Sequence, residues 1–156
     1  MSMFCYQCQE TAGGKGCTVH GVCGKSEEVA KLQDLLIYTL KGISEIVVKG
    51  KINVKSLGQT NYEVLNSLFM TITNANFDAD SIEKQIVKMI AVRDKLRNST
   101  DCADLHDAAT FTVSCRVSML GKAASIGVLS TADEDVRSLR EMITYGLKGM
   151  AAYTEH

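Results

Sequence analysis

Helical periodicity without proline is the feature of this sequence that most constrains its fold. None of the 156 residues is proline, which favours uninterrupted helices over turn-rich β structure. The first helix is expected to begin after Ser26 as its N-cap, with Glu27 and Glu28 in the first turn, where the helix dipole favours acidic groups. Its apolar stripe consists of Val29, Leu32, Leu35, Leu36, Leu40, Ile43 and either Ile46 or Val47. We therefore predict an all-α fold.

Polar capping residues followed by apolar residues at helical spacing predict further helices along the chain. These helices are expected at residues 60–73, 80–97, 112–125 and 131–156. Thr60, Asp80 and Thr131 are the predicted capping or starting residues of three of them. The polar stretch between the second and third of these helices is expected to be irregular.

The last predicted helix resembles the first one. SEEVAKLQDLLIYTLKGISE at 26–45 and DEDVRSLREMITYGLKGMAA at 133–152 share seven of twenty positions without a gap. Any two amphipathic helices match at apolar positions. This explains less well the coincidence of Tyr38 with Tyr145 and of the Leu-Lys-Gly triplet that follows each tyrosine. The match favours an internal duplication of a helical bundle.

The repeat suggests three parts of the chain. Residues 1–25 form a cysteine-rich loop, 26–130 a first helical bundle, and 131–156 the start of a second bundle that is truncated. A helix with one apolar stripe must bury it on something. We therefore expect that the last helix either docks on the first bundle or belongs to a longer protein.

Composition excludes several classes of function. The net charge is −1, with 17 basic and 18 acidic residues, so neither nucleic acid nor an anionic membrane is an expected partner. The apolar runs are far shorter than a membrane span, and the N-terminal residues lack the pattern of a secretory signal. A cytoplasmic location is expected, where thiols stay reduced or bind metal.

Four of the six cysteines, Cys5, Cys8, Cys17 and Cys23, lie within nineteen residues in the spacing C-x2-C-x8-C-x5-C. Four thiolates can hold an iron–sulfur cluster or a zinc ion. One tight pair with two spread cysteines, interleaved with glycines whose N–H groups can approach sulfur, favours a cluster. Zinc, and thiols without any metal, remain the alternatives.

The other candidate ligands have no companions at metal-binding spacing. Cys102 and Cys115 are predicted to be buried structural thiols, and His20 is predicted to face solvent. His106 and His156 stand alone in the sequence. Because no carboxylate acid–base pair or phosphate-binding loop is evident either, no catalytic residue is predicted.

Several stretches carry a resemblance to a known family. They are MFCYQCQET at 3–11, GGKGCTVHGVCGK at 13–25, LQDLLIYTLKG at 32–42, TITNANFD at 71–78, RDKLRN at 93–98 and EDVRSLRE at 134–141. In this order they are similar to the N-terminal region of the hybrid cluster proteins, also called prismane proteins, a family of hydroxylamine reductases. The resemblance covers essentially the whole chain and implies a first domain built from two three-helix bundles.

The resemblance also implies cofactors and partners. Cys5, Cys8, Cys17 and Cys23 would hold a [4Fe-4S] cluster that relays single electrons to a hybrid iron–sulfur–oxygen cluster. The ligand motifs of that second cluster are absent here, so this chain alone is expected to be inactive. The expected partners are an electron donor protein, the rest of the reductase chain, and a second copy bound through the last helix. The alternative is a stand-alone zinc- or iron–sulfur-binding helical protein with a structural or interaction role.

Overall fold

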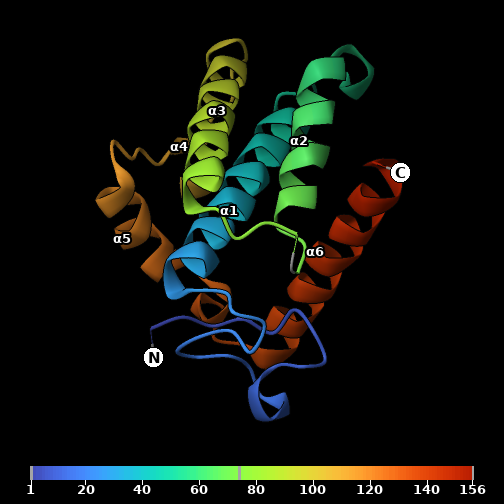
Figure 1. The fold of residues 1–156 in the computed structure, drawn as a ribbon. Helices are drawn as coiled ribbons and strands as arrows, with labels where there is room; N and C mark the ends of the chain where they lie inside the picture. Colours follow the sequence, from blue (N-terminus) through green and yellow to red (C-terminus); the bar gives the residue numbers. More distant parts are fainter. Residues whose placement is uncertain (1, 74, 156) are drawn as a thin grey trace.

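The computed structural model describes residues 2–73 and 75–155 (Figure 1). Its elements in chain order are η1 (Ala12–Gly14), α1 (Glu27–Lys49), η2 (Val54–Ser56), α2 (Gly58–Met70), α3 (Ala79–Asn98), α4 (Asp107–Thr110), α5 (Arg116–Ile126), η3 (Val128–Ser130) and α6 (Glu134–Glu155). Across these two ranges, the one β pairing is an isolated antiparallel bridge between Cys5 and Cys17. The predicted all-α class is confirmed.

Helix α1 is the central helix of the fold and packs against α3, α4 and α5 (Figure 1). The hydroxyl oxygen of Ser26 accepts a hydrogen bond from the backbone N–H of Val29 at 3.2 Å, so the predicted N-cap is confirmed. The apolar stripe of α1 is buried along its whole length. Ile82, Ile86 and Met89 of α3 close over it in one continuous core.

The first residues of three helices differ from the predictions. Helix α2 begins at Gly58 because the N–H of Asn61 already bonds to the carbonyl of Leu57 at 2.8 Å, so Thr60 lies inside the first turn. Helix α3 is capped by the carboxylate of Asp78, which accepts from two backbone N–H groups. Helix α6 is capped by Asp133, whose carboxylate accepts from the N–H of Val136 at 2.9 Å.

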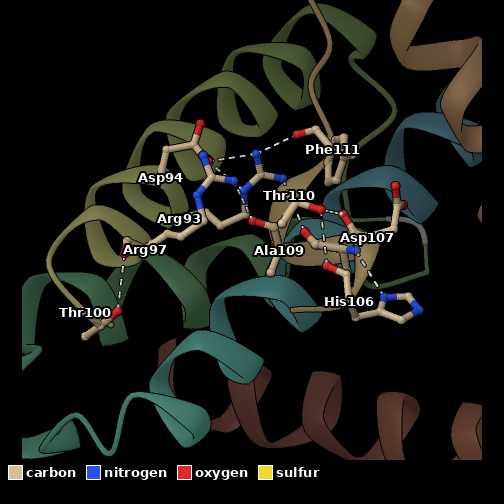
Figure 2. A network of polar contacts seen from close by, with 10 residues as sticks. Arg93, Asp94, Arg97, Thr100, His106, Asp107, Ala109, Thr110 and Phe111 are labelled. Carbon is tan, nitrogen blue, oxygen red and sulfur yellow. Dashed lines mark hydrogen bonds and ion pairs between the residues drawn. The ribbon is translucent and has the colours of Figure 1, made fainter. Parts of the chain in front are cut away.

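Helix α5 begins at Arg116, four residues after the predicted start, and the short helix α4 lies in the stretch predicted to be irregular. The cause is the buried guanidinium of Arg93 on α3 (Figure 2). It donates to the carbonyls of Ala108 at 3.2 Å and Phe111 at 2.7 Å, and it lies 4.5 Å from the centre of the Phe111 ring. Since Arg93 holds Phe111 in extended backbone, the helical pattern cannot extend back through it.

Helix α6 docks beside α2, away from the core that surrounds α1 (Figure 1). Among its described side chains, Lys148 and Ala151 are buried, whereas most of its apolar residues face solvent. The cysteine loop, which we define as residues 2–25, crosses one end of the bundle next to the start of α6. No helix in the described ranges is long and apolar enough to cross a membrane.

Candidate metal centre

The cysteine loop is folded back on itself at Cys5 and Cys17. The N–H of Cys5 donates to the carbonyl of Cys17 at 3.0 Å, and the N–H of Cys17 donates to the carbonyl of Cys5 at 2.9 Å. Met3 and Cys17 pack with Ala30 of α1 in a small apolar cluster. These contacts attach the loop to the first turns of α1, so the helix positions two of the four predicted ligands.

Two glycines are required by the path of the loop. Gly16 has φ of 116°, and a Cβ atom on it would lie 2.6 Å from the ring of Phe4. Gly24 has φ of 93°, in the region that side chains rarely adopt. One residue therefore lets the backbone turn directly before Cys17, and the other lets it turn directly after Cys23.

The sulfur of Cys17 lies among hydrogen-bond donors. The backbone N–H of Ala12 approaches it at 3.5 Å, and the hydroxyl of Thr11 lies 3.6 Å away. The N–H groups of Ala12 and Val22 hold the pKa of this thiol below its usual value, because they stabilise the thiolate. This environment suits a metal-ligating sulfur, since ligand thiols must be deprotonated.

The remaining three sulfurs differ in exposure. Cys5 and Cys8 are half-buried, and Cys23 is exposed. Burial raises the pKa of the Cys5 thiol, while the positive charge of Lys25 opposes this increase. All six cysteines of the chain are free thiols. Among the described residues, no three His, Cys, Asp or Glu side chains converge closely enough to bind one metal ion, so the ligand role of the quartet stays a prediction.

A cavity of about 870 Å³ separates the cysteine loop from α6. Cys5 and Cys8 form part of its wall on the loop side, and Glu141 and Lys148 form part of the wall on α6. Asp34 of α1 also reaches this cavity. Burial raises the pKa of Asp34 to about 7, although the charge of Lys148 opposes the shift. The cavity thus brings thiols and charged groups together from three segments distant in sequence.

Two buried lysines complete this environment, and sequence reasoning missed both. Lys25 is 1% exposed and donates to the side-chain oxygen of Gln33 at 2.7 Å. Lys148 is 5% exposed and donates to the carbonyl of Thr71 at 3.2 Å. The sequence did place Lys148 in the Leu-Lys-Gly triplet of the repeat, but the triplet by itself does not indicate which lysine is buried.

The loop fits an anionic iron–sulfur group on three grounds. It offers four free thiols, backbone N–H donors at the Cys17 sulfur, and buried cationic side chains nearby. Anionic clusters in proteins are stabilised by hydrogen bonds to their sulfurs and by the surrounding charge. The residues present are therefore chemically suited to such a group.

The family model described as Prismane/CO dehydrogenase family matches residues 3–156. The chain belongs to this family. Among curated proteins, the chain is similar to the hydroxylamine reductase of Acetivibrio thermocellus, with 74% identity over 156 residues. The hydroxylamine reductase of Clostridium perfringens is 49% identical over 164 residues, and hydroxylamine reductase 2 of Clostridium acetobutylicum is 47% identical over 182.

Each of these alignments covers all of this chain, but only 29%, 30% and 32% of the respective relative. The chain thus spans about a third of the length of the hydroxylamine reductases it matches. The family resemblance inferred from the sequence stretches is confirmed, and the region matched is the N-terminal part of the relatives.

The other candidate ligands lie outside this centre. Cys115 is exposed at the start of α5, so its predicted burial is wrong: the chain is extended before Arg116, and this leaves the thiol at a free helix end. Cys102 is half-buried and not buried as predicted, because its sulfur lies beside the carbonyl of Ile46 near the end of α1. His20 is exposed, as predicted, and His106 caps α4 by accepting from the N–H of Ala108. The prediction for His156 lies outside the described residues.

Proposed function

We propose that Cys5, Cys8, Cys17 and Cys23 hold a [4Fe-4S] cluster in the N-terminal part of a hydroxylamine reductase. The bound cluster would supply one-electron transfer toward a hybrid cluster held outside these 156 residues. The whole protein would reduce hydroxylamine with two electrons and two protons to ammonia and water. The observation that carries the proposal is the four free thiols on one anchored loop, in a chain of this family.

The loop itself has three roles in this proposal. Its thiolates bind iron, and the N–H groups around Cys17 stabilise the negative charge at that sulfur. The bridge between Cys5 and Cys17 orients both residues from one short piece of backbone. Because Cys23 is exposed and its neighbour Val22 is also exposed, we place the approach of an electron donor protein at this edge of the loop. Six free thiols also support a reducing, cytoplasmic location.

Anaerobic reconstitution of the chain with iron and sulfide tests the cluster. We expect equal amounts of bound iron and sulfide, and an EPR signal of a reduced [4Fe-4S] cluster after dithionite treatment. Cys17→Ser should abolish or strongly reduce cluster binding, whereas Cys115→Ser, which removes an exposed thiol outside the loop, should leave it unchanged. Tight zinc binding without iron uptake would falsify the cluster and support the structural zinc alternative.

Measurements of hydroxylamine reduction test whether the active site lies outside these 156 residues. The chain by itself should show no hydroxylamine turnover with a chemical electron donor, because the hybrid cluster would lie elsewhere in the whole protein. Measured turnover by the reconstituted 156-residue chain would instead place an active site within it.

We further propose that α6 begins a second helical bundle. Its apolar residues Leu139, Met142, Ile143 and Met150 are exposed, whereas the corresponding residues of α1 are buried. In the whole protein these residues would be covered by helices that correspond to α3 and α5. Hydrogen exchange of α6 should then be slower in the whole protein than in this chain. A concentration-dependent dimer in sedimentation would show instead that a second copy covers the stripe.

A further inference from the structure

Two buried lysines, one at the end of the cysteine loop and one on α6, donate hydrogen bonds to neutral groups. Lys25 comes from the end of the loop, and Lys148 comes from α6. Among the described residues, neither nitrogen has an Asp or Glu oxygen within 4.0 Å. A buried ammonium costs free energy unless opposite charge or several hydrogen bonds offset the loss of water.

Among the residues that the structure describes, a further buried cation, Arg93, has such compensation (Figure 2). Arg93 is fully buried, and its guanidinium lies 2.9 Å from the carboxylate of Asp94 while it also donates to two backbone carbonyls. In contrast, Lys25 donates to the neutral amide of Gln33, and Lys148 donates to one carbonyl. The two lysines are therefore undercompensated relative to Arg93.

The carbonyl bound by Lys148 belongs to Thr71, at the C-terminal end of α2. A helix C-terminus carries a partial negative charge of about half a unit, so it offsets part of the charge of one ammonium. This contact explains how α6 docks on α2, but it provides no partner for Lys25. The carboxyl groups of Asp34 and Glu141 offset part of the remaining positive charge from beyond ion-pair distance.

Both lysines lie close to predicted ligands. Lys25 follows Cys23 by two residues, and the Cβ of Lys25 and the sulfur of Cys23 lie 3.0 and 3.2 Å from the position that a Cβ on Gly21 would occupy. Lys148 lines the cavity that Cys5 and Cys8 also line. Burial lowers the pKa of Lys148 to about 8, which leaves it mainly charged at pH 7. The carboxyl groups that line the cavity are Asp34, Glu134 and Glu141, and burial raises the pKa of Asp34 to about 7.

The [4Fe-4S] cluster proposed for the cysteine loop has a charge opposite to that of the lysines. Four thiolates around an oxidised [4Fe-4S] core of charge +2 leave a net charge of −2, and reduction by one electron adds another negative charge. An ammonium held nearby in a medium of low dielectric constant stabilises the more negative, reduced form. Each lysine should therefore make reduction easier.

We propose that Lys25 and Lys148 are positioning residues that raise the reduction potential of the cluster bound by the cysteine loop. This inference rests on the proposed function, because it requires the cluster. Because Lys148 lies on α6, the inference assigns this helix a role in the metal centre. In sequence, Lys148 is more than a hundred residues from the nearest cysteine ligand. The loop alone would then bind iron, and the helix would set how readily the iron is reduced.

An EPR-monitored redox titration of the reconstituted chain tests this inference. In Lys25→Met and in Lys148→Met, the ratio of reduced to oxidised cluster at a given applied potential should fall at least tenfold, which is about 59 mV for one electron. Lys55→Met removes an exposed charge beyond the opposite end of α1 and should leave the titration unchanged. Lys148→Arg keeps the charge and should stay close to the unsubstituted chain.

The outcomes separate this inference from the proposed function. If the unsubstituted chain binds no cluster, the proposed function fails and the inference fails with it. If the cluster forms and both methionine variants titrate like Lys55→Met, only the inference is overturned. If Lys148→Met loses the cluster, retention by Lys148→Arg would support a role of the charge, whereas loss in both variants would contradict it.

Discussion

Helices α1 and α6 share a sequence pattern but have opposite surroundings. Leu32 and Leu36 of α1 are 0% exposed, whereas the matching Leu139 and Ile143 of α6 are 59% and 65% exposed. Helix α1 is covered by α3, α4 and α5, while α6 packs against α2 and η3. The comparison shows that an apolar stripe of this kind indicates a helix that needs partners, without indicating which partners it has.

The shared Leu-Lys-Gly triplet differs in the same way. In α1, a Cβ on Gly42 would lie 2.1 Å from the carbonyl oxygen of Ala108, and Lys41 is exposed. In α6, Gly149 has open space around it, and Lys148 is buried against α2. The glycine therefore allows close packing in one copy, and the lysine reaches the candidate metal centre in the other.

The largest difference in stability between the two helices is expected when a side chain of the apolar stripe is replaced by alanine. Leu36→Ala should lower the free energy of unfolding by about 2–5 kcal/mol, because it leaves a cavity in the core. Ile143→Ala should change it by less than about 0.5 kcal/mol, because the side chain is already exposed in this chain. Urea denaturation followed by circular dichroism measures both. Equal losses would mean that α6 is covered in solution.

A smaller contrast is expected at the glycines. Gly42→Ala should destabilise the chain by about 1–3 kcal/mol, because the methyl group must displace the backbone of Ala108. Gly149→Ala should stabilise it by about 0.5–1 kcal/mol, since alanine is the better helix former and meets no atoms there. Thermal unfolding of the two variants compares them directly, and a shift of the same sign in both would contradict the difference in packing.

The smallest contrast concerns the tyrosines. The hydroxyl of Tyr38 donates to the carboxylate of Asp107 at 2.7 Å, whereas Tyr145 is exposed and makes no hydrogen bond through its side chain among the described residues. Tyr38→Phe should cost about 1 kcal/mol at pH 7, and Tyr145→Phe should have no measurable effect. Denaturation curves of the two variants at matched pH test this pair.

The cost of Tyr38→Phe should also depend on pH. The ammonium of Lys122 and the hydroxyl of Tyr38 hold the pKa of Asp107 below its usual value. The stabilisation from this carboxylate is therefore present above the unfolded-state pKa of about 3.9 and is lost as the pH falls through the lower folded-state value. The difference between Tyr38→Phe and the unsubstituted chain should shrink below about pH 4, and a constant difference would argue against the contact.

Much of the fold could be predicted from local sequence patterns. The cap at Ser26, the stripe of α1 and the order of the helices all follow from residue types at short spacing. The start of α5 could not be predicted, because it depends on Arg93, which lies more than twenty residues earlier. The exposure of Cys115 depends on that same start, which explains why its predicted burial was wrong.

The candidate metal centre could also be predicted only in part from the sequence. The spacing of Cys5, Cys8, Cys17 and Cys23 predicted the ligand set, which stays a prediction, and the matching sequence stretches predicted the family, which is confirmed. The N–H donors at Cys17 were expected in kind, since the glycines around the ligands suggested close backbone approach. The burial of Lys25 and Lys148 could not be predicted, because nothing in the spacing of lysines distinguishes a buried ammonium from a solvated one.

The amino-acid sequence by itself determined the helical class, the apolar stripes and the cysteine quartet, because periodicity and spacing are properties of neighbouring residues. Only the tertiary structure decided which stripe is buried, which glycine permits close contact, and which lysine lines the cavity next to Cys5 and Cys8. Burial and electrostatic potential at a residue depend on atoms from distant parts of the chain, so two nearly matching segments acquire different roles. In this protein, α1 builds the core and α6 brings a charge to the candidate metal centre.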